Sequence, residues 1–232
     1  CLKSTEKIIS LAKKTNGRLH VFHLSTKEEA KLFDNQNDLK NKKITSEVCI
    51  HHLSFNDADY KTKGNFIKWN PSIKTIEDQN ALWDALRSDK IDVIATDHAP
   101  HTFNEKNQLY VDCPSGGPLV QHSLYIMYEH FLEKRISLEK IVEKMCHNPA
   151  ILFNIKKRGF IREGFFADLV ILRKNQSWVI NKNNILYKCG WSPFEGKKIN
   201  SMITHTFVSG NLAYENGVFN QNIMGKKIEF NS

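Results

Sequence analysis

The sequence predicts an α/β protein with a parallel sheet, followed by a smaller all-β region. Three observations support this prediction. Strand-like and helix-like segments alternate through the amino-terminal part, which is typical of a parallel sheet. Polar residues collect directly after the strand ends, where open α/β sheets and (β/α) barrels place their sites. After Gly164 the pattern changes to short strands separated by turn residues.

The first element is a helix over residues 4–15, where apolar residues recur at helical spacing. Ser4 and Thr5 offer N-caps, and Asn16-Gly17 ends the helix. Ser25-Thr26 can cap the next helix, and Glu77 suits the first turn of another. The same reasoning predicts the other elements of this region: strands at 18–24, 44–50, 66–69 and 93–95, and helices at 27–33 and 75–86.

The region from Pro118 to about Asn154 is predicted to be helical, with Ser137 as a helix cap. The carboxyl-terminal tail is predicted to be a separate β layer, so we divide the chain into residues 1–160 and residues 161–232. The expected helices are 119–131, 138–146 and 149–153, and the expected strands are 167–172, 179–180, 203–208, 212–214 and 218–219.

Composition excludes several classes of protein. The net charge is +8, but the lysines are scattered, which indicates solvated faces and not a nucleic-acid surface. No stretch approaches the roughly 20 apolar residues of a membrane helix. The five cysteines form no CxxC pair, as expected of a reduced, cytoplasmic protein. The chain shows no signal peptide and does not begin with Met, and the order of its motifs favours a fragment of a longer protein.

Three strand ends carry residues that could perform chemistry: His20–Thr26, Glu47–Leu53 and Thr96–His101. Histidines at the ends of neighbouring strands, with an Asp on a third, make a candidate divalent-metal site, because imidazole and carboxylate are ligands that Zn²⁺ prefers. An Asp beside a metal can also accept a proton from water.

Simpler interpretations compete with this one. A histidine after a strand is more often a hydrogen-bonding loop residue than a ligand. His98 could form a surface pair with Asp97, and Cys49 is expected to be a small buried residue. Structural roles are expected for four further histidines, in helical or β-tail contexts: His122, His130, His147 and His205.

The run Thr96-Asp97-His98-Ala99-Pro100-His101 resembles dihydroorotases and related cyclic amidohydrolases. The other strand ends resemble the fifth- and sixth-strand segments of that family, and Lys68–Lys74 resembles the Asn-Pro element after its seventh strand. The tail segments 164–171 and 192–196 resemble the part that returns to a β-sandwich. The resemblance covers nearly the whole chain. It implies the second half of a TIM-type (β/α)8 barrel, followed by a small β-sandwich segment.

The resemblance also implies residue roles. His23 and His51 would bind one metal of a binuclear pair, with Zn²⁺ the expected ion. Asp97 would bind the other metal and act as general acid and base. Four residues would contact the small-molecule substrate, dihydroorotate or N-carbamoyl-L-aspartate, and they are Asn70, His101, Ser115 and Gly116. No nucleic acid or membrane partner is implied, and a homodimer is compatible with the family.

The sequence departs from the family pattern in two kinds of place. Ile50 replaces the usual Pro before the histidine pair, and Ser72-Ile73-Lys74 replaces Pro-Leu-Arg; both changes keep the polar anchors. The His-x-His pair of the first strand and the bridging carboxylate of the fourth do not occur. With only three protein ligands, we expect these 232 residues alone to bind metal weakly and to be inactive.

Three alternatives remain open at this point. Allantoinases and hydantoinases share the same metal scaffold, although the Asn-Pro element, His101 and the Cys113–Gly116 loop favour dihydroorotase. A non-catalytic, dihydroorotase-like scaffold subunit would have lost metal ligands, which retention of His23, His51 and Asp97 argues against. A nucleic-acid-binding role is the third and would show salt-dependent binding to random DNA.

Overall fold

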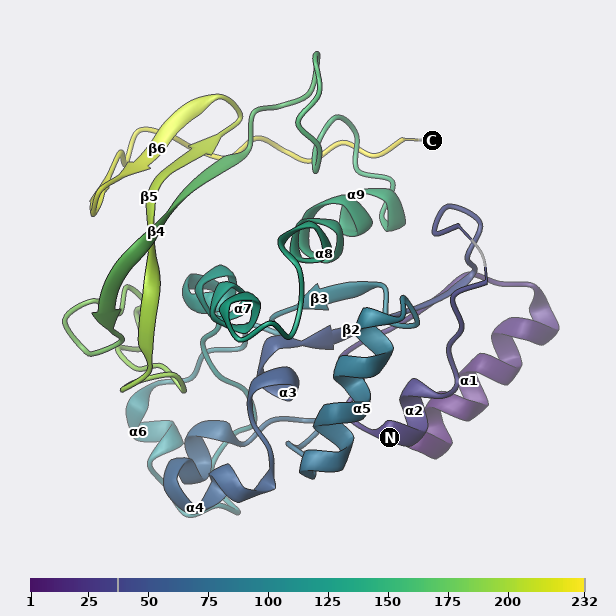
Figure 1. Cartoon of the computed structure of the whole chain (residues 1–232). Coiled ribbons are helices and arrows are strands. Elements are labelled where there is room, and N and C mark those ends of the chain that lie inside the picture. The colour runs from purple at the N-terminus through teal and green to yellow at the C-terminus, as the bar shows by residue number, and fades with distance from the viewer. Residues whose placement is uncertain (37, 232) are drawn as a thin grey trace.

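The computed structural model describes residues 1–36 and 38–231 (Figure 1). Its amino-terminal part contains a parallel sheet of three strands in chain order: β1 (Leu19–Val21), β2 (Ile44–Cys49) and β3 (Val93–Ala95). The carboxyl ends of the three strands therefore lie along the same edge of the sheet. This arrangement confirms the predicted α/β fold and the parallel sheet.

Three helices accompany this sheet: α1 (Leu2–Thr15), α2 (Lys27–Ala30) and α5 (Ile76–Arg87). α1 begins before Ser4 and Thr5, so those N-caps are wrong; Cys1 is the cap and makes no side-chain cap bond. Its predicted end is confirmed, because Asn16 adopts the left-handed conformation there. The Thr26 hydroxyl accepts a hydrogen bond from the Glu29 amide at the start of α2, as predicted.

The strand predicted at 66–69 is wrong. Residues 64–67 form a 3₁₀ turn, and Lys68 and Trp69 follow in irregular structure. Instead of pairing with a strand, the segment places Trp69 against the His51 ring, at 4.3 Å between centroids. The elements between β2 and α5 are short and helical: α3 (Ile50–Ser54), a 3₁₀ turn (Asp57–Asp59), α4 (Tyr60–Lys63) and the 3₁₀ turn Gly64–Ile67.

In the helical region after β3, α7 and α8 lie between the parallel sheet and the antiparallel sheet, whereas α6 lies near α4 (Figure 1). Ser137 caps α8 by accepting a hydrogen bond from the Lys140 amide, as predicted. None of the helices in residues 1–36 and 38–231 is both long and apolar enough to cross a lipid bilayer. The elements are α6 (Phe103–Lys106), a 3₁₀ turn (Val120–His122), α7 (Ser123–Leu132), α8 (Leu138–Val142), a π-helical turn (Glu143–His147) and α9 (Asn148–Leu152).

The tail forms a four-stranded antiparallel sheet: β4 (Leu169–Val179), β5 (Lys198–Val208), β6 (Asn211–Glu215) and β7 (Val218–Phe219). The strands predicted at 167–172 and 179–180 are largely one long strand, β4, with a pairing irregularity between Lys174 and Trp178. The sheet rests on α7, where the Tyr125 hydroxyl accepts a hydrogen bond of 3.0 Å from the Ile203 amide. The all-β character of the tail is confirmed.

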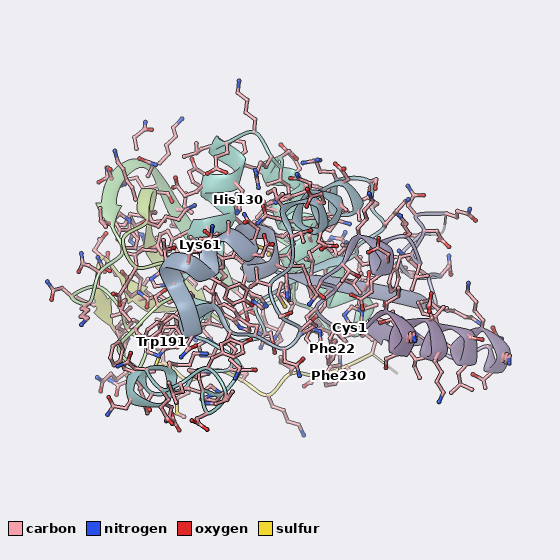
Figure 2. The ribbon with its side chains drawn as sticks, turned by 90° about the horizontal axis from the view of Figure 1, so that it is seen from below. Cys1, Phe22, Lys61, His130, Trp191 and Phe230 are labelled. Carbon is pink, nitrogen blue, oxygen red and sulfur yellow. The ribbon has the colours of Figure 1, made fainter. Side chains whose placement is uncertain are left out.

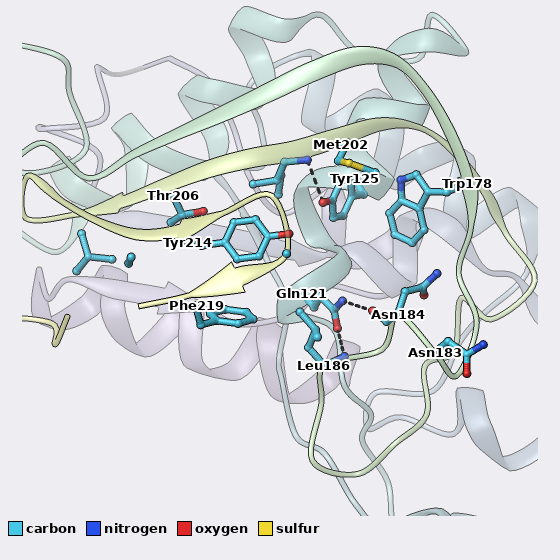
Figure 3. Close-up of a pocket in the computed structure, with 14 residues that line it drawn as sticks. Gln121, Tyr125, Trp178, Asn183, Asn184, Leu186, Met202, Thr206, Tyr214 and Phe219 are labelled. Carbon is cyan, nitrogen blue, oxygen red and sulfur yellow. Dashed lines mark hydrogen bonds between the residues drawn. The ribbon is translucent and has the colours of Figure 1, made fainter. Parts of the chain in front are cut away.

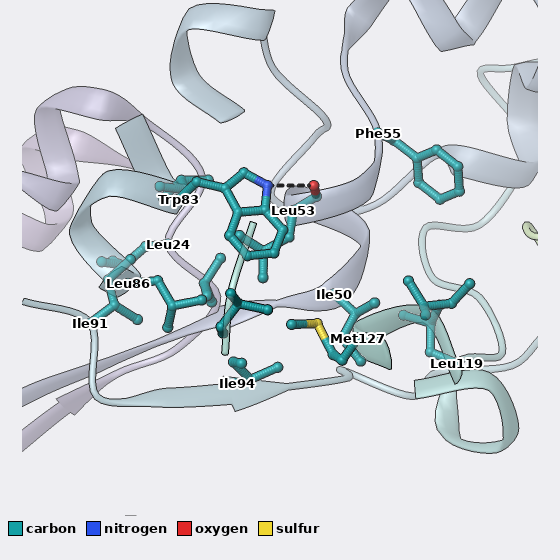
Figure 4. Close-up of a cluster of buried hydrophobic side chains, with 14 of the residues drawn as sticks. Leu24, Ile50, Leu53, Phe55, Trp83, Leu86, Ile91, Ile94, Leu119 and Met127 are labelled. Carbon is teal, nitrogen blue, oxygen red and sulfur yellow. Dashed lines mark hydrogen bonds between the residues drawn. The ribbon is translucent and has the colours of Figure 1, made fainter. Parts of the chain in front are cut away.

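The hydrophobic core combines buried side chains of β2 and β3 with side chains of α5 and α7 (Figure 4). Trp83 belongs to this core and has only 2% of its surface exposed. Its indole N–H donates a hydrogen bond of 3.0 Å to the Leu53 carbonyl. At the amino-terminal end of the sheet, Lys42 and Asp92 form a buried ion pair of 2.8 Å. The ion pair lies at the amino-terminal ends of β2 and β3, whereas the predicted site residues lie at the carboxyl-terminal ends of the strands.

Candidate active site

The three predicted metal ligands occupy equivalent places in the fold. His23, His51 and Asp97 each lie two residues beyond the last residue of β1, β2 and β3. His23 and Asp97 have φ angles of 41° and 46°, in the left-handed region. Non-glycine residues in that region store backbone strain, and such residues cluster at functional sites.

His51 lies in an unusual environment. Its side chain has no exposed surface, and neither ring nitrogen has a hydrogen-bond partner among the described residues. The Trp69 ring stacks on it with 4.3 Å between centroids and 6° between planes. Burial lowers the pKa of His51 well below its usual value, so the imidazole is neutral at pH 7. A neutral imidazole with an unused, buried nitrogen is what a metal ligand requires.

The three predicted ligands do not form a complete metal site in the described residues. The charge of His23 contributes to the low pKa of His51, and the charge of Asp97 raises the pKa of Cys49, although burial is the larger cause in both cases. In the part of the chain that the structure describes, no group of three or more His, Cys, Asp or Glu side chains is placed to hold a metal ion. The types of side chain and the unpartnered, buried nitrogens of His51 fit a metal, and the described residues alone do not complete its coordination.

The predicted substrate contacts meet on two adjoining loops. Nε2 of His101 lies 3.0 Å from the Ser115 carbonyl oxygen. The Gly116 amide donates to the Lys68 carbonyl at 2.9 Å, two residues before Asn70, whose side chain is exposed. The structure therefore brings His101, Ser115 and Gly116 together and places the backbone next to Asn70 against the same loop.

Two lysines that the sequence analysis did not identify brace this loop. The Lys68 ammonium donates to the carbonyls of Tyr110 and Cys113. Lys106 is fully buried, and its ammonium donates to the Pro114 carbonyl at 2.9 Å. No local pattern marks these lysines, because their acceptors are backbone carbonyls distant in sequence.

His98 does not form the surface pair with Asp97 that was considered above. Its Nδ1 accepts hydrogen bonds from the amides of Leu119 and Val120, at 3.0 and 3.3 Å, so the ring secures the segment after the substrate loop. His130 binds Ser54 and Glu133, in keeping with the structural role expected for it.

One large hollow in the described structure is lined by none of these residues. It has a volume of about 600 Å³ and lies between the antiparallel sheet and α7, beside Tyr125, Trp178 and Tyr214 (Figure 3). None of the predicted site residues lines it, and its lining contains no charged side chain. A smaller hollow of about 330 Å³ borders His23, next to Phe22, which is 58% exposed at the surface near Cys1 (Figure 2). Of the predicted site residues, His23 is the one that lines this smaller hollow.

Comparison with known proteins decides the family. The sequence profile of the amidohydrolase family matches residues 5–213. The chain belongs to the amidohydrolase family. Two amidohydrolases similar to it are dihydroorotases. That of Endomicrobium trichonymphae is 36% identical over 208 residues, 89% of this chain and 49% of that protein. That of Pyrococcus furiosus is 32% identical over 214 residues, 92% of this chain and 49% of that protein.

Solved hydantoinase structures share the fold. The L-hydantoinase of Arthrobacter aurescens superimposes with a TM-score of 0.85 and 27% identity, covering 94% of this chain and 49% of that one. The D-hydantoinase of a Thermus species gives a TM-score of 0.82 at 22% identity, over 97% of this chain and 50% of that one. This chain therefore spans about half the length of the relatives that it matches, and the resemblance noted in its sequence is confirmed at the level of the family.

Proposed function

We propose that the protein containing this chain is a dihydroorotase, which interconverts dihydroorotate and N-carbamoyl-L-aspartate in pyrimidine synthesis. The observation that carries the proposal is the run Thr96–His101. It leaves β3 with Asp97 at the ligand position, and it ends at His101, whose ring reaches the Ser115 carbonyl. The similarity to dihydroorotases over most of this chain supports the same activity.

The amidohydrolase family implies a metal cofactor. We propose Zn²⁺ as the ion, with His23 and His51 holding one metal and Asp97 the second of a binuclear pair. A divalent metal in such a site lowers the pKa of water and polarises the carbonyl that is attacked. Neutral imidazole and carboxylate donors suit zinc.

The residues of this chain would then divide the remaining work. The Asp97 carboxylate takes a proton from the attacking water and delivers it to the ring nitrogen that leaves. Its exposed side chain leaves it free to meet solvent and substrate. Asn70, His101 and the backbone of Ser115 and Gly116 would bind the ring and its carboxylate. Lys68 and Lys106 hold the preceding residues of that loop in place by donating to the carbonyls of Cys113 and Pro114.

The wider setting of the site is also proposed. The parallel strands in chain order support half of a TIM-type (β/α)8 barrel, and the antiparallel tail supports part of a β-sandwich. An open barrel sheet needs further strands to close, so a homodimer or a longer chain would complete the structure. The five cysteines are all free, which supports a reducing, cytoplasmic location.

A substrate comparison tests the proposal. The complete protein, supplied with Zn²⁺, is offered dihydroorotate, hydantoin and allantoin, with an Asp97→Asn variant as the control. We expect turnover of dihydroorotate alone, and its loss in the variant. The hydantoinase-like fold makes hydantoin hydrolysis the second candidate. Turnover of hydantoin or allantoin without dihydroorotate would contradict the proposal, and bound zinc without any turnover would indicate a scaffold subunit.

A further inference from the structure

His51 lacks the hydrogen bond that normally orients a metal-binding histidine. Such a histidine usually donates its second ring N–H to a carboxylate or a carbonyl, and this bond fixes the plane of the ring. In the described residues, Nδ1 and Nε2 of His51 both have no partner. Its neighbour His52 does have one, because Nε2 of His52 lies 3.1 Å from the Pro71 carbonyl oxygen. Some other contact must therefore set the orientation of the His51 ring.

Trp69 supplies that contact. The two rings are almost parallel, with 6° between planes and 4.3 Å between centroids, and Trp69 is only 3% exposed. A metal bound to an imidazole lies in the plane of the ring, along the nitrogen lone pair. A stack that fixes the plane of His51 therefore fixes the directions in which it can bind a metal.

The six-membered ring of Trp69 also lies close to Gly117, which follows Ser115 and Gly116 in the same loop. A Cβ atom added to Gly117 would lie 2.9 Å from Cζ2 of Trp69 and 3.1 Å from Cη2 of Trp191. The φ angle of Gly117 lies outside the left-handed region, so its backbone does not require glycine. The close approach of the indole ring is the reason that a larger residue is excluded.

We propose that Trp69 is a positioning residue: it fixes the ring plane of His51 and couples that plane to the loop of residues 115–117. The inference rests on the proposed function in one respect, namely that His51 is a metal ligand. Through this coupling, a displacement of residues 115–117 would rotate the His51 ring and so change the direction of its nitrogen lone pairs, although these residues do not contact His51 directly.

The indole nitrogen of Trp69 strengthens the inference. It is buried and has no hydrogen-bond partner among the described residues. A buried N–H without a partner costs free energy, which an apolar side chain of similar size would avoid. Trp69 is therefore a poor choice for stability alone, and its broad, flat ring is what the contacts with His51 and Gly117 use.

The first test measures zinc affinity in the complete protein by competition with a chelating dye. Trp69→Leu keeps an apolar side chain but removes the stacking ring, and Trp69→Phe keeps a ring in place. We expect Trp69→Leu to weaken zinc binding about 10- to 100-fold, as loss of an orienting contact does at other metal sites, and Trp69→Phe to bind nearly as well as the parent. Equal zinc affinity in Trp69→Leu and the parent, at equal melting temperature, would overturn the inference.

The second test changes the loop and not Trp69, so it does not require the Trp69→Leu variant to fold. Gly117→Ala pushes a methyl group against the indole, so we expect weaker zinc binding and a raised KM. In the double variant Gly117→Ala/Trp69→Phe, the shorter ring makes room for the methyl group and both values should recover. Absence of recovery in a folded double variant would also overturn the inference. Zinc responses of the expected sign in a protein that does not turn over dihydroorotate would refute the proposed activity and leave the coupling intact.

Discussion

Gly116 offers a sharp test of the substrate loop. Its φ angle is +114°, and a Cβ atom there would lie 2.6 Å from the Ala99 carbonyl oxygen and 2.9 Å from the Ala99 Cβ. Gly116→Ala therefore combines a disfavoured backbone conformation, which costs about 1–3 kcal/mol, with a contact that forces one segment to move. We take about 2 kcal/mol as the total strain on this basis.

The strain introduced by Gly116→Ala should lower the melting temperature or raise the KM for dihydroorotate. If the loop keeps its position, the melting temperature should fall by about 4–8 °C, because 1 kcal/mol shifts a protein of this size by about 2–4 °C. If the loop moves away from Ala99, stability recovers and substrate binding suffers, so KM should rise by up to about 30-fold. The assay is a thermal melt of each variant together with steady-state kinetics on dihydroorotate.

Gly225→Ala is the matched control, because a Cβ atom there meets nothing within 4 Å and its φ angle is not in the left-handed region. This variant should match the parent in both measurements. A Gly116→Ala variant that also matched the parent in both would refute the account of the loop given above.

Three further predictions follow from the site and the core. Asp97→Asn should reduce kcat by about 10²- to 10⁴-fold, the usual contribution of a general acid–base group, with little change in melting temperature because the side chain is exposed. Lys42→Met leaves Asp92 buried without its partner and should lower the free energy of unfolding in urea by about 3–5 kcal/mol. The double variant Lys42→Met/Asp92→Asn should recover much of that free energy. An unchanged free energy of unfolding in Lys42→Met would contradict the role of the ion pair. Burial lowers the pKa of His122 to about 4, so the unfolded chain binds its proton first, and this contribution to stability should be complete above pH ~6.5 and lost as the pH falls towards ~4. Urea titrations at pH 7 and pH 5 should show a smaller difference in His122→Gln than in the parent, and an equal difference would refute the assignment.

The parts of the fold that follow from short-range rules were predicted well from the sequence. The helix cap at Thr26 and the helix end at Asn16 depend on side chains within a few residues, and both were predicted correctly. The placement of polar residues after β1, β2 and β3 also needed only the local alternation of the sequence. Most predictions from signals of a few residues therefore succeeded; the exception is the start of α1, where Ser4 and Thr5 lie inside the helix and not at its N-cap.

The errors arose where distant segments compete. Residues 66–69 have the local pattern of a strand, but residues 64–67 form a 3₁₀ turn and Trp69 stacks on His51, a residue distant in sequence. The brace from Lys106 to the Pro114 carbonyl has no sequence signature, because any residue can offer a carbonyl. The distances between the three predicted ligand positions also depend on long-range packing, which the local sequence pattern does not determine.

The left-handed backbone at His23 and Asp97 has a practical consequence for engineering. At both positions glycine would relax the main chain, and each replacement could add on the order of 1 kcal/mol to the stability of the fold. A screen that selects for heat resistance alone would therefore favour loss of two residues that we propose as metal ligands. Efforts to stabilise this protein should keep His23 and Asp97 unchanged and introduce substitutions in the antiparallel sheet β4–β7.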